Sequence, residues 1–253
     1  MNKFPLVFKH YFKRTLMDKM GLITQIGIPV GIMLFMIITN DFSELIDTQG
    51  LEFVEALQTT ILSGIVFSFL FFGGAWFMEF LYKDLREAKK WRLGAAPVDK
   101  SVYAFGAMAG SFIVSLAQSI LVIIVGLILT EARIQNIGIW IVLMLLTAIA
   151  SHLFHYAITF FAKDKSVAVM LGNIFGIGFA LLGGAWIVGI HEAINHPIAD
   201  FLYDFGTPVS LARRAIDYAP TDMSTATGAI LILVGATVLL VIVTFILGKV
   251  KKL

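Results

Sequence analysis

Six stretches of the chain are apolar for long enough to cross a lipid bilayer. A transmembrane helix needs about 20 mostly apolar residues, whereas a transmembrane strand needs about 10 with alternating polarity. Because backbone polar groups in lipid must be satisfied within their own segment, these long runs predict helices. The sequence therefore predicts an all-α polytopic membrane protein with one domain over residues 1–253. The expected spans lie near 21–39, 57–81, 102–129, 138–162, 167–190 and 226–248.

The composition excludes the main alternatives to a membrane protein. Of the 253 residues, 58% are hydrophobic and only 14% are charged, against about 25% charged residues in an ordinary soluble domain. A soluble enzyme, a disordered chain and a nucleic-acid-binding domain are all excluded by that balance. The chain has no cysteine, so disulfides, thiolate chemistry and cysteine-ligated metals are excluded as well.

The basic residues predict the orientation of the chain. Of the 19 Lys and Arg residues, all except Arg133, Arg213 and Arg214 precede the first span, follow the second or fourth span, or lie in the C-terminal tail. The segment 40–56 carries acidic residues and no Lys or Arg. Cytoplasmic segments of membrane proteins are enriched in Lys and Arg. We therefore expect a multi-pass protein of the plasma membrane, bacterial in origin, with both termini in the cytoplasm.

Two segments outside the spans have helical patterns of their own. Within residues 1–20, aromatic side chains such as Phe4, Phe8 and Phe12 recur at helical spacing among cations, which predicts a helix in the membrane interface. The alternative is a plain basic flank. Within 191–225 we expect two short helices at the outer surface, the second starting at Thr207-Pro208, since Thr is a favoured cap and Pro a favoured first residue.

Small residues one helical turn apart predict close contacts between spans. In lipid, helices associate by close packing, and small side chains let their backbones approach each other. The tetrapeptide Gly-Gly-Ala-Trp also occurs twice, at 73–76 and 183–186, and indicates similar packing of the second and fifth spans. The glycine pairs that lie one helical turn apart are Gly27/Gly31, Gly106/Gly110 and Gly172/Gly176.

Motifs for catalysis and ion coupling are missing. The one Gly-Lys pair, Gly248-Lys249, lacks the rest of a phosphate-binding loop, and His191 and His196 are five residues apart where a zinc-protease helix needs four. No metal site is therefore expected. Among ionisable residues in the spans, we expect Glu79 to pair with a cationic loop residue. For His152 and His155, hydrogen bonds between helices are favoured over a role in a path.

The arrangement resembles the permease subunit of ABC type-2 exporters. The resemblance covers essentially the whole chain: an amphipathic N-terminal helix, six spans, a charged first cytoplasmic loop and outer helices before the last span. The best local match is in that loop, which reads Asp84-Leu85-Arg86-Glu87, then Arg92-Leu93, then Ala95-Ala96-Pro97-Val98. Ala88-Lys89 replaces the usual Gly-Thr of the family. Pro208 with Leu211 and Arg213 is a second match.

The resemblance implies a half-transporter without an ATPase site of its own. A cytoplasmic ATP-binding-cassette subunit would hold the ATP and magnesium, and a second permease copy or a paralogue would complete the membrane part in the bilayer. The substrate would be amphipathic or hydrophobic: a drug, an antimicrobial peptide or a lipid. Coupling to the ATPase is expected at Asp84, Arg86, Glu87, Arg92, Leu93 and Pro97. The translocation path is expected at Phe69, Phe72, Trp76, Gly183, Gly184 and Trp186.

Two other classes of protein stay open on the sequence alone. An intramembrane enzyme or maturation factor would need a polar cluster at depth, for which His152 and His155 are the candidates. A secondary carrier would need carboxylates or Lys near the middle of the membrane. The spans carry none there, which favours a transporter whose energy comes from a partner.

Overall fold

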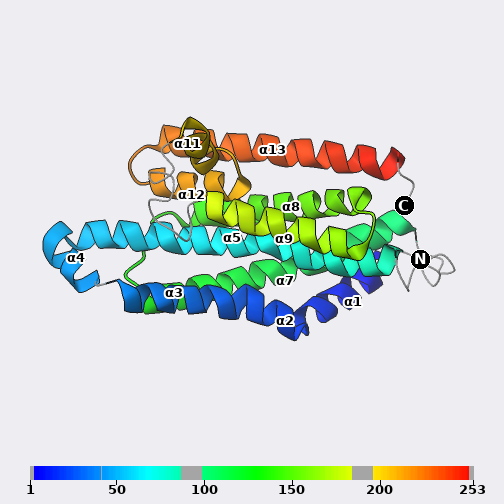
Figure 1. Ribbon diagram of the computed structural model, residues 1–253, viewed down its shortest axis with the longest axis horizontal. Coiled ribbons are helices and arrows are strands. Elements are labelled where there is room, and N and C mark those ends of the chain that lie inside the picture. Colours follow the sequence, from blue (N-terminus) through cyan, green and yellow to red (C-terminus); the bar gives the residue numbers. More distant parts are fainter. Residues whose placement is uncertain (1–2, 41, 87–98, 184–195, 251–253) are drawn as a thin grey trace.

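The computed structural model describes residues 3–40, 42–86, 99–183 and 196–250, and this part of the chain is built from helices joined by short connections (Figure 1). The helices are α1 (Phe4–Leu16), α2 (Lys19–Leu22), the π-helix η1 (Ile23–Gly27), α3 (Ile28–Thr39), α4 (Phe42–Gln49), α5 (Leu51–Arg86), α7 (Lys100–Leu129), α8 (Ile137–Phe161), α9 (Lys165–Leu182), α11 (Pro197–Asp204), α12 (Pro208–Tyr218) and α13 (Met223–Val250).

Six of these segments are long and apolar enough to cross a membrane. They are Lys19–Thr39, Leu51–Leu85, Ser101–Leu129, Ile137–Phe161, Lys165–Leu182 and Met223–Lys249. The prediction of an all-α polytopic membrane protein is thereby confirmed. The second span begins at Leu51, earlier than the expected residue 57, because the acidic turn before it continues the helix. Both termini lie at one end of the bundle (Figure 1), which is called the terminal end below; the opposite end is the distal end.

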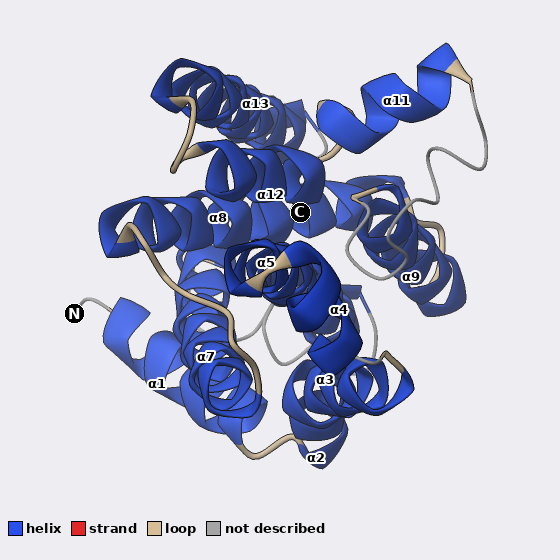
Figure 2. Ribbon diagram, turned by 90° about the vertical axis from the view of Figure 1, so that its left-hand side faces the viewer, coloured by secondary structure: helices blue, strands red, loops and turns tan. Residues whose placement is uncertain are grey.

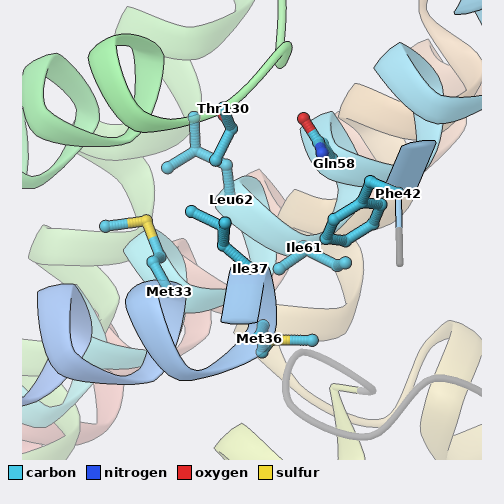
Figure 3. A pocket seen from close by; sticks show the side chains of 8 residues that line it. All are labelled: Met33, Met36, Ile37, Phe42, Gln58, Ile61, Leu62 and Thr130. Carbon is cyan, nitrogen blue, oxygen red and sulfur yellow. The ribbon is translucent and has the colours of Figure 1, made fainter. Parts of the chain in front are cut away.

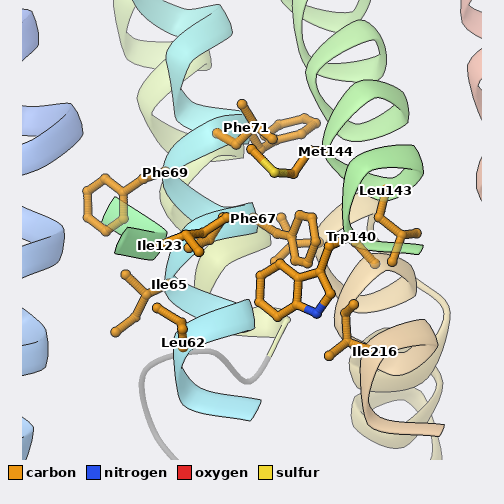
Figure 4. Close-up of a cluster of buried hydrophobic side chains, with 14 of the residues drawn as sticks. Leu62, Ile65, Phe67, Phe69, Phe71, Ile123, Trp140, Leu143, Met144 and Ile216 are labelled. Carbon is orange, nitrogen blue, oxygen red and sulfur yellow. The ribbon is translucent and has the colours of Figure 1, made fainter. Parts of the chain in front are cut away.

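The second span, α5, is the central helix of the bundle. Its most apolar window is 89% buried, against 17% for the last span and 22% for the first. Figure 2 shows α5 surrounded by α3, α7, α8, α9 and α12. The main hydrophobic core forms where α5 meets α8 (Figure 4), and Phe67 stacks on Trp140 there with ring centroids 5.7 Å apart.

Two adjacent glycines allow the neighbours of α5 to come close. A Cβ at Gly73 would lie 2.7 Å from the Ser115 hydroxyl of α7, and a Cβ at Gly74 would lie 2.8 Å from the backbone carbonyl of Ser151 in α8. The Ser151 hydroxyl uses this proximity, since it donates to the carbonyl of Phe71 and accepts from the Gly74 N–H at 3.2 Å. The Gly-Gly step therefore places α5 directly against two other spans.

Only two of the three expected glycine pairs mediate such contacts. A Cβ at Gly110 would lie 2.8 Å from the backbone of α1, and one at Gly172 would lie 2.6 Å from the end of Met78 in α5. Gly27 and Gly31 have no atom of another helix within 4 Å. The prediction of tight packing at that pair is therefore wrong for this chain, because the first span lies at the edge of the bundle.

The N-terminal helix α1 has two different faces. Val7, Tyr11 and Thr15 are buried where the helix lies along α7, its main neighbour. Phe8 stacks between Phe4 and Phe12, with centroids 6.4 and 6.1 Å apart, on a row that is only partly covered. The expected aromatic helix is present, and the bundle covers a different side of it from the aromatic row.

The distal end is closed by short helices. As expected, α12 begins behind a Thr207 cap, whose hydroxyl accepts from the Ser210 N–H at 2.9 Å. On the other side of α5, helices α3, α4 and α5 leave a cavity of only about 10 Å³ beside Gln58 and Phe42 (Figure 3). A cavity of that size holds about one water molecule, so the first two spans are sealed together there.

We predict that Gly74→Ala destabilises the bundle by about 1 to 3 kcal/mol, the usual cost of adding atoms to a filled core. The added Cβ would lie 2.5 Å from His155 Nδ1 as well as against the Ser151 backbone, and backbone atoms cannot rotate away. The matched control is Gly228→Ala in α13, where no atom lies within 4 Å. Thermal unfolding in detergent should show a lower midpoint for the first variant alone; equal midpoints would contradict the close contact.

Candidate functional site

A groove runs along α5 between the first span and α9. It consists of two adjoining compartments of about 230 and 260 Å³, which share Thr24 and Phe72 in their walls. The central helix α5 forms the floor, and η1 with α3 and α9 form the two sides. Together the compartments are of the size that small-molecule sites have in proteins.

The compartment nearer the distal end is almost entirely apolar. Phe69 and Phe72 of α5 face aliphatic side chains of the other two helices, while Gly176 and Ala180 keep the α9 side shallow. Its one buried orphan group is the Ser68 hydroxyl, which has no hydrogen-bond partner. A buried hydroxyl without a partner carries a desolvation cost that a ligand could remove. The compartment therefore suits an apolar group that carries a single hydrogen-bonding atom.

The compartment nearer the terminal end is more polar. Trp76 Nε1 donates to the Thr24 hydroxyl at 2.7 Å, which ties α5 to the first span. Glu79 is at the mouth of this compartment and pairs with Lys83 at 2.8 Å and with Lys165 at 3.2 Å. Both cations lie in helices, Lys83 within α5 and Lys165 at the first residue of α9, so Glu79 pairs with cations as expected, but not with a loop residue.

The structure brings together half of the residues predicted for a path. Phe69, Phe72 and Trp76 line the groove on consecutive turns of α5. Gly183 does not line it: this residue caps the end of α9, and a Cβ there would lie 2.7 Å from Val209 of α12. Gly184 and Trp186 lie outside the described residues.

The side walls of the groove were not predicted from the sequence. Thr24, Ile28, Asn173 and Ala180 line it from the first and fifth spans. Asn173 is a polar residue inside an apolar run, and Gly176 belongs to a glycine pair that had been interpreted as packing alone. These two signals could have indicated α9, whereas the contribution of the first span depends on how the helices are arranged.

A buried arginine of α12 connects α5 and α9 at the distal end of the groove. Arg213 of α12 is 4% exposed; its Nε donates to the Gly183 carbonyl at 2.7 Å, and one of its terminal nitrogens bonds Asp217 at 2.8 Å. Asp217 in turn accepts from Thr60 of α5 at 2.7 Å. Burial raises the pKa of Asp217, and Arg213 opposes that rise. This distal latch links α5 to α9 through α12.

A second polar cluster lies at the terminal end, around Asp84. Its side chain is fully buried, and one of its oxygens accepts from the Tyr11 hydroxyl at 2.5 Å, from Arg14 at 2.6 Å and from the Tyr103 hydroxyl at 2.8 Å. Burial raises the pKa of Tyr11 well above its ordinary value, so the phenol keeps its proton as a donor. The cluster joins α1, α5 and α7.

The other residues predicted for coupling lie at or beyond the end of α5. Arg86 is the last residue of that helix, and Glu87, Arg92, Leu93 and Pro97 lie outside the described residues. Asp84 is turned into the bundle instead of toward a docking surface. Any part that it has in coupling is therefore indirect, through the helices that it joins.

The two buried histidines make structural bonds. His152 Nδ1 bonds the Ala148 carbonyl at 2.8 Å, and its Nε2 lies 3.4 Å from the Ser111 hydroxyl of α7; His155 Nδ1 bonds the Ser151 carbonyl at 2.8 Å. Neither residue lines the groove. Across the described ranges no group of His, Asp and Glu side chains could hold a metal ion.

Comparison with known proteins identifies a family for the chain. The profile of the family described as "ABC-2 family transporter protein" matches residues 13–247. This match includes all six spans, the groove, the distal latch and Asp84. No curated protein is similar enough to count as a relative.

We expect Asp84→Asn to destabilise the protein by about 2 kcal/mol. Removing one partner of a fully buried ion pair costs about 3 to 5 kcal/mol, and the cost is smaller here because Arg14 keeps 23% of its side chain exposed. The control is Asp204→Asn, which breaks a surface pair with Arg214 of the same kind, 2.8 Å long, and should cost at most about 1 kcal/mol. The readout is thermal unfolding in detergent; equal shifts for the two variants would refute a special role of the Asp84 cluster.

Proposed function

Because this chain belongs to the ABC-2 family of transporter proteins, it is a membrane subunit of an ABC transporter, and we propose that it exports amphipathic or hydrophobic molecules. The family implies a partner ATPase subunit. In the proposal, ATP and magnesium are bound by that subunit, and this chain itself is not catalytic. The terminal end faces the cytoplasm, as the distribution of Lys and Arg favours.

The observation that carries the proposal is the groove along α5. It joins a polar mouth at the terminal end to an apolar compartment in the middle of the bundle. This combination suits a substrate that has one polar end and an otherwise apolar surface. Phe69 and Phe72 would contact the apolar part, and the unpartnered Ser68 hydroxyl could bond one polar atom. A drug-like molecule, a lipid or an apolar peptide segment has these properties.

The two polar clusters suggest how the groove would be opened and closed. The distal latch through Arg213 keeps α5 and α9 together at the far end. The segment after α5 would receive the movement of the ATPase, and the Asp84 cluster would pass it to α1 and α7. Two arrangements of packed helices, each favoured by a different nucleotide state, are sufficient for alternating access. A second copy of this chain, or a paralogue, would cover the open side of the groove.

The alternative classes receive no support from the described residues. A membrane enzyme would need a reactive site around His152 and His155, but Nδ1 of each ring is bonded to a backbone carbonyl and neither ring lines the groove. A secondary carrier would need an ionisable site in the middle of the groove. The carboxylate that lines the groove, Glu79, is paired with two lysines at its terminal mouth.

We predict that Gly176→Trp abolishes transport while Gly178→Trp preserves it. Gly176 packs directly against the Phe72 ring in the wall of the apolar compartment, so a large side chain would push that ring into the compartment and obstruct it. Gly178 is two residues further along the same helix, and a Cβ there would have no atom within 4 Å. The chain is coexpressed with an ATP-binding-cassette subunit that copurifies with it, and the complex is placed in proteoliposomes with a fluorescent hydrophobic dye. ATP-dependent dye movement that is lost equally in both variants, or in neither, would refute the groove as the path.

A further inference from the structure

A further cavity lies at the distal end and is separate from the groove. It has a volume of about 700 Å³ and lies between the start of α5, the connection from α7 to α8, and the turn from α12 to α13. None of the residues that line it also lines the groove. A volume of this order falls within the range of sites for drug-sized ligands. Its walls differ from those of the groove, because polar and apolar groups alternate along them.

At the inner wall of the cavity is a tryptophan whose N–H is unused. Trp140 is only 3% exposed, and its ring stacks on Phe67. Figure 4 shows the indole nitrogen on the edge of the ring that points away from Phe67 and toward Ile216, another residue of the cavity wall. In the described part of the chain this N–H makes no hydrogen bond. Indole N–H groups usually find a partner when the ring is buried, and this one reaches the cavity, where it can donate to an acceptor on a ligand.

The charges on the wall favour a positively charged ligand. Three carboxylates line the cavity, those of Glu52, Glu55 and Asp217, against one arginine, Arg133. Glu55 pairs with Arg133 at 2.7 Å, and Asp217 pairs with Arg213 behind the wall at 2.8 Å. Glu52 forms no ion pair with a described residue. It is therefore the carboxylate on this wall whose charge is left uncompensated by the protein.

We propose that this distal cavity binds a cationic peptide segment, with a basic side chain at Glu52 and a backbone carbonyl on the Trp140 N–H. A peptide supplies a cation and a hydrogen-bond acceptor on different residues of one chain, as the site requires, because Glu52 lies about 22 Å along α5 from Phe67, on which Trp140 stacks. Its apolar side chains can contact Ile139 and Ile216. A simple inorganic cation would use the carboxylate and leave the indole unpaired. An apolar molecule would use neither group. The inference does not depend on the groove being a transport path.

Binding of a defined peptide to the purified full chain tests this inference. The probe is a capped Lys-Leu-Lys-Leu peptide, titrated into the protein in phosphatidylcholine nanodiscs by isothermal calorimetry, and the matched probe is capped Gln-Leu-Gln-Leu. We expect the basic peptide to bind more tightly by about fivefold, as the pairing of opposite charges at an exposed carboxylate allows. Raising the salt concentration should weaken binding of the basic peptide alone.

Two variants connect the binding to the named groups. Trp140→Phe keeps the aromatic stacking and removes the donor, and should raise the Kd of the basic peptide about fivefold, as expected for the loss of one hydrogen bond. Glu52→Gln is on an exposed turn of α5, where folding is not at risk, and should abolish the preference for the basic peptide. The control is Asp47→Asn, which removes an exposed distal carboxylate outside the cavity lining and should leave the Kd unchanged.

Several results would overturn the inference. Equal binding of the basic and neutral peptides would show a merely apolar cavity, and an unchanged preference in Glu52→Gln would place the cation elsewhere. An equal loss of affinity in the Trp140 and Asp47 variants would place the peptide on the outer surface and not in the cavity. No ATPase subunit takes part in this experiment, so its outcome is independent of whether the groove transports anything.

Discussion

The enclosure of one helix determines how the rest of this protein is arranged. The most apolar window of the second span, α5, is 89% buried, and in lipid a helix gains nothing from water exclusion when it approaches another helix. Close contact must therefore come from shape. Gly73 and Gly74 provide it, because they let α7 and α8 come up to the backbone of α5 and let Ser151 bond directly to it. With α7 and α8 held on one side, the groove is left on the other, between the first span and α9.

Of the two polar clusters at the ends of the central helix, one joins it to helices away from the groove and the other joins it to a helix beside the groove. At the terminal end, Asp84 connects α5 to α1 and α7, which lie away from the groove. At the distal end, Arg213 and Asp217 connect α5 to α9, which borders it. Buried ionic groups are costly to separate once formed. The structure thus has a polar cluster that fixes each end of α5 to its neighbours. A conformational change of the proposed transporter would have to preserve one of these clusters while it rearranges the other.

The sequence predicted the helices well, and the site only in part. Long apolar runs, the Thr207-Pro208 start and the pairing of Glu79 with cations depend on neighbours along the chain or on simple charge rules, and all agree with the structure. The groove depends on which faces of distant helices meet, so Phe72 and Trp76 could be predicted while Thr24 and Ile28 of the first span could not. Gly27 and Gly31 show the converse error: the local spacing favoured a contact that the edge position of the first span does not supply.

The most direct test of the central claim is the side from which Phe72 can be reached. The natural chain has no cysteine, so single cysteines at Phe72, at Asp47 on the distal end and at Lys163 on the terminal end can be labelled with a membrane-impermeant maleimide in proteoliposomes that contain the ATPase partner. The account predicts that the Phe72 cysteine reacts from the side of Lys163 without nucleotide and from the side of Asp47 with a non-hydrolysable ATP analogue. Labelling from one side in both states, or from neither, would contradict it.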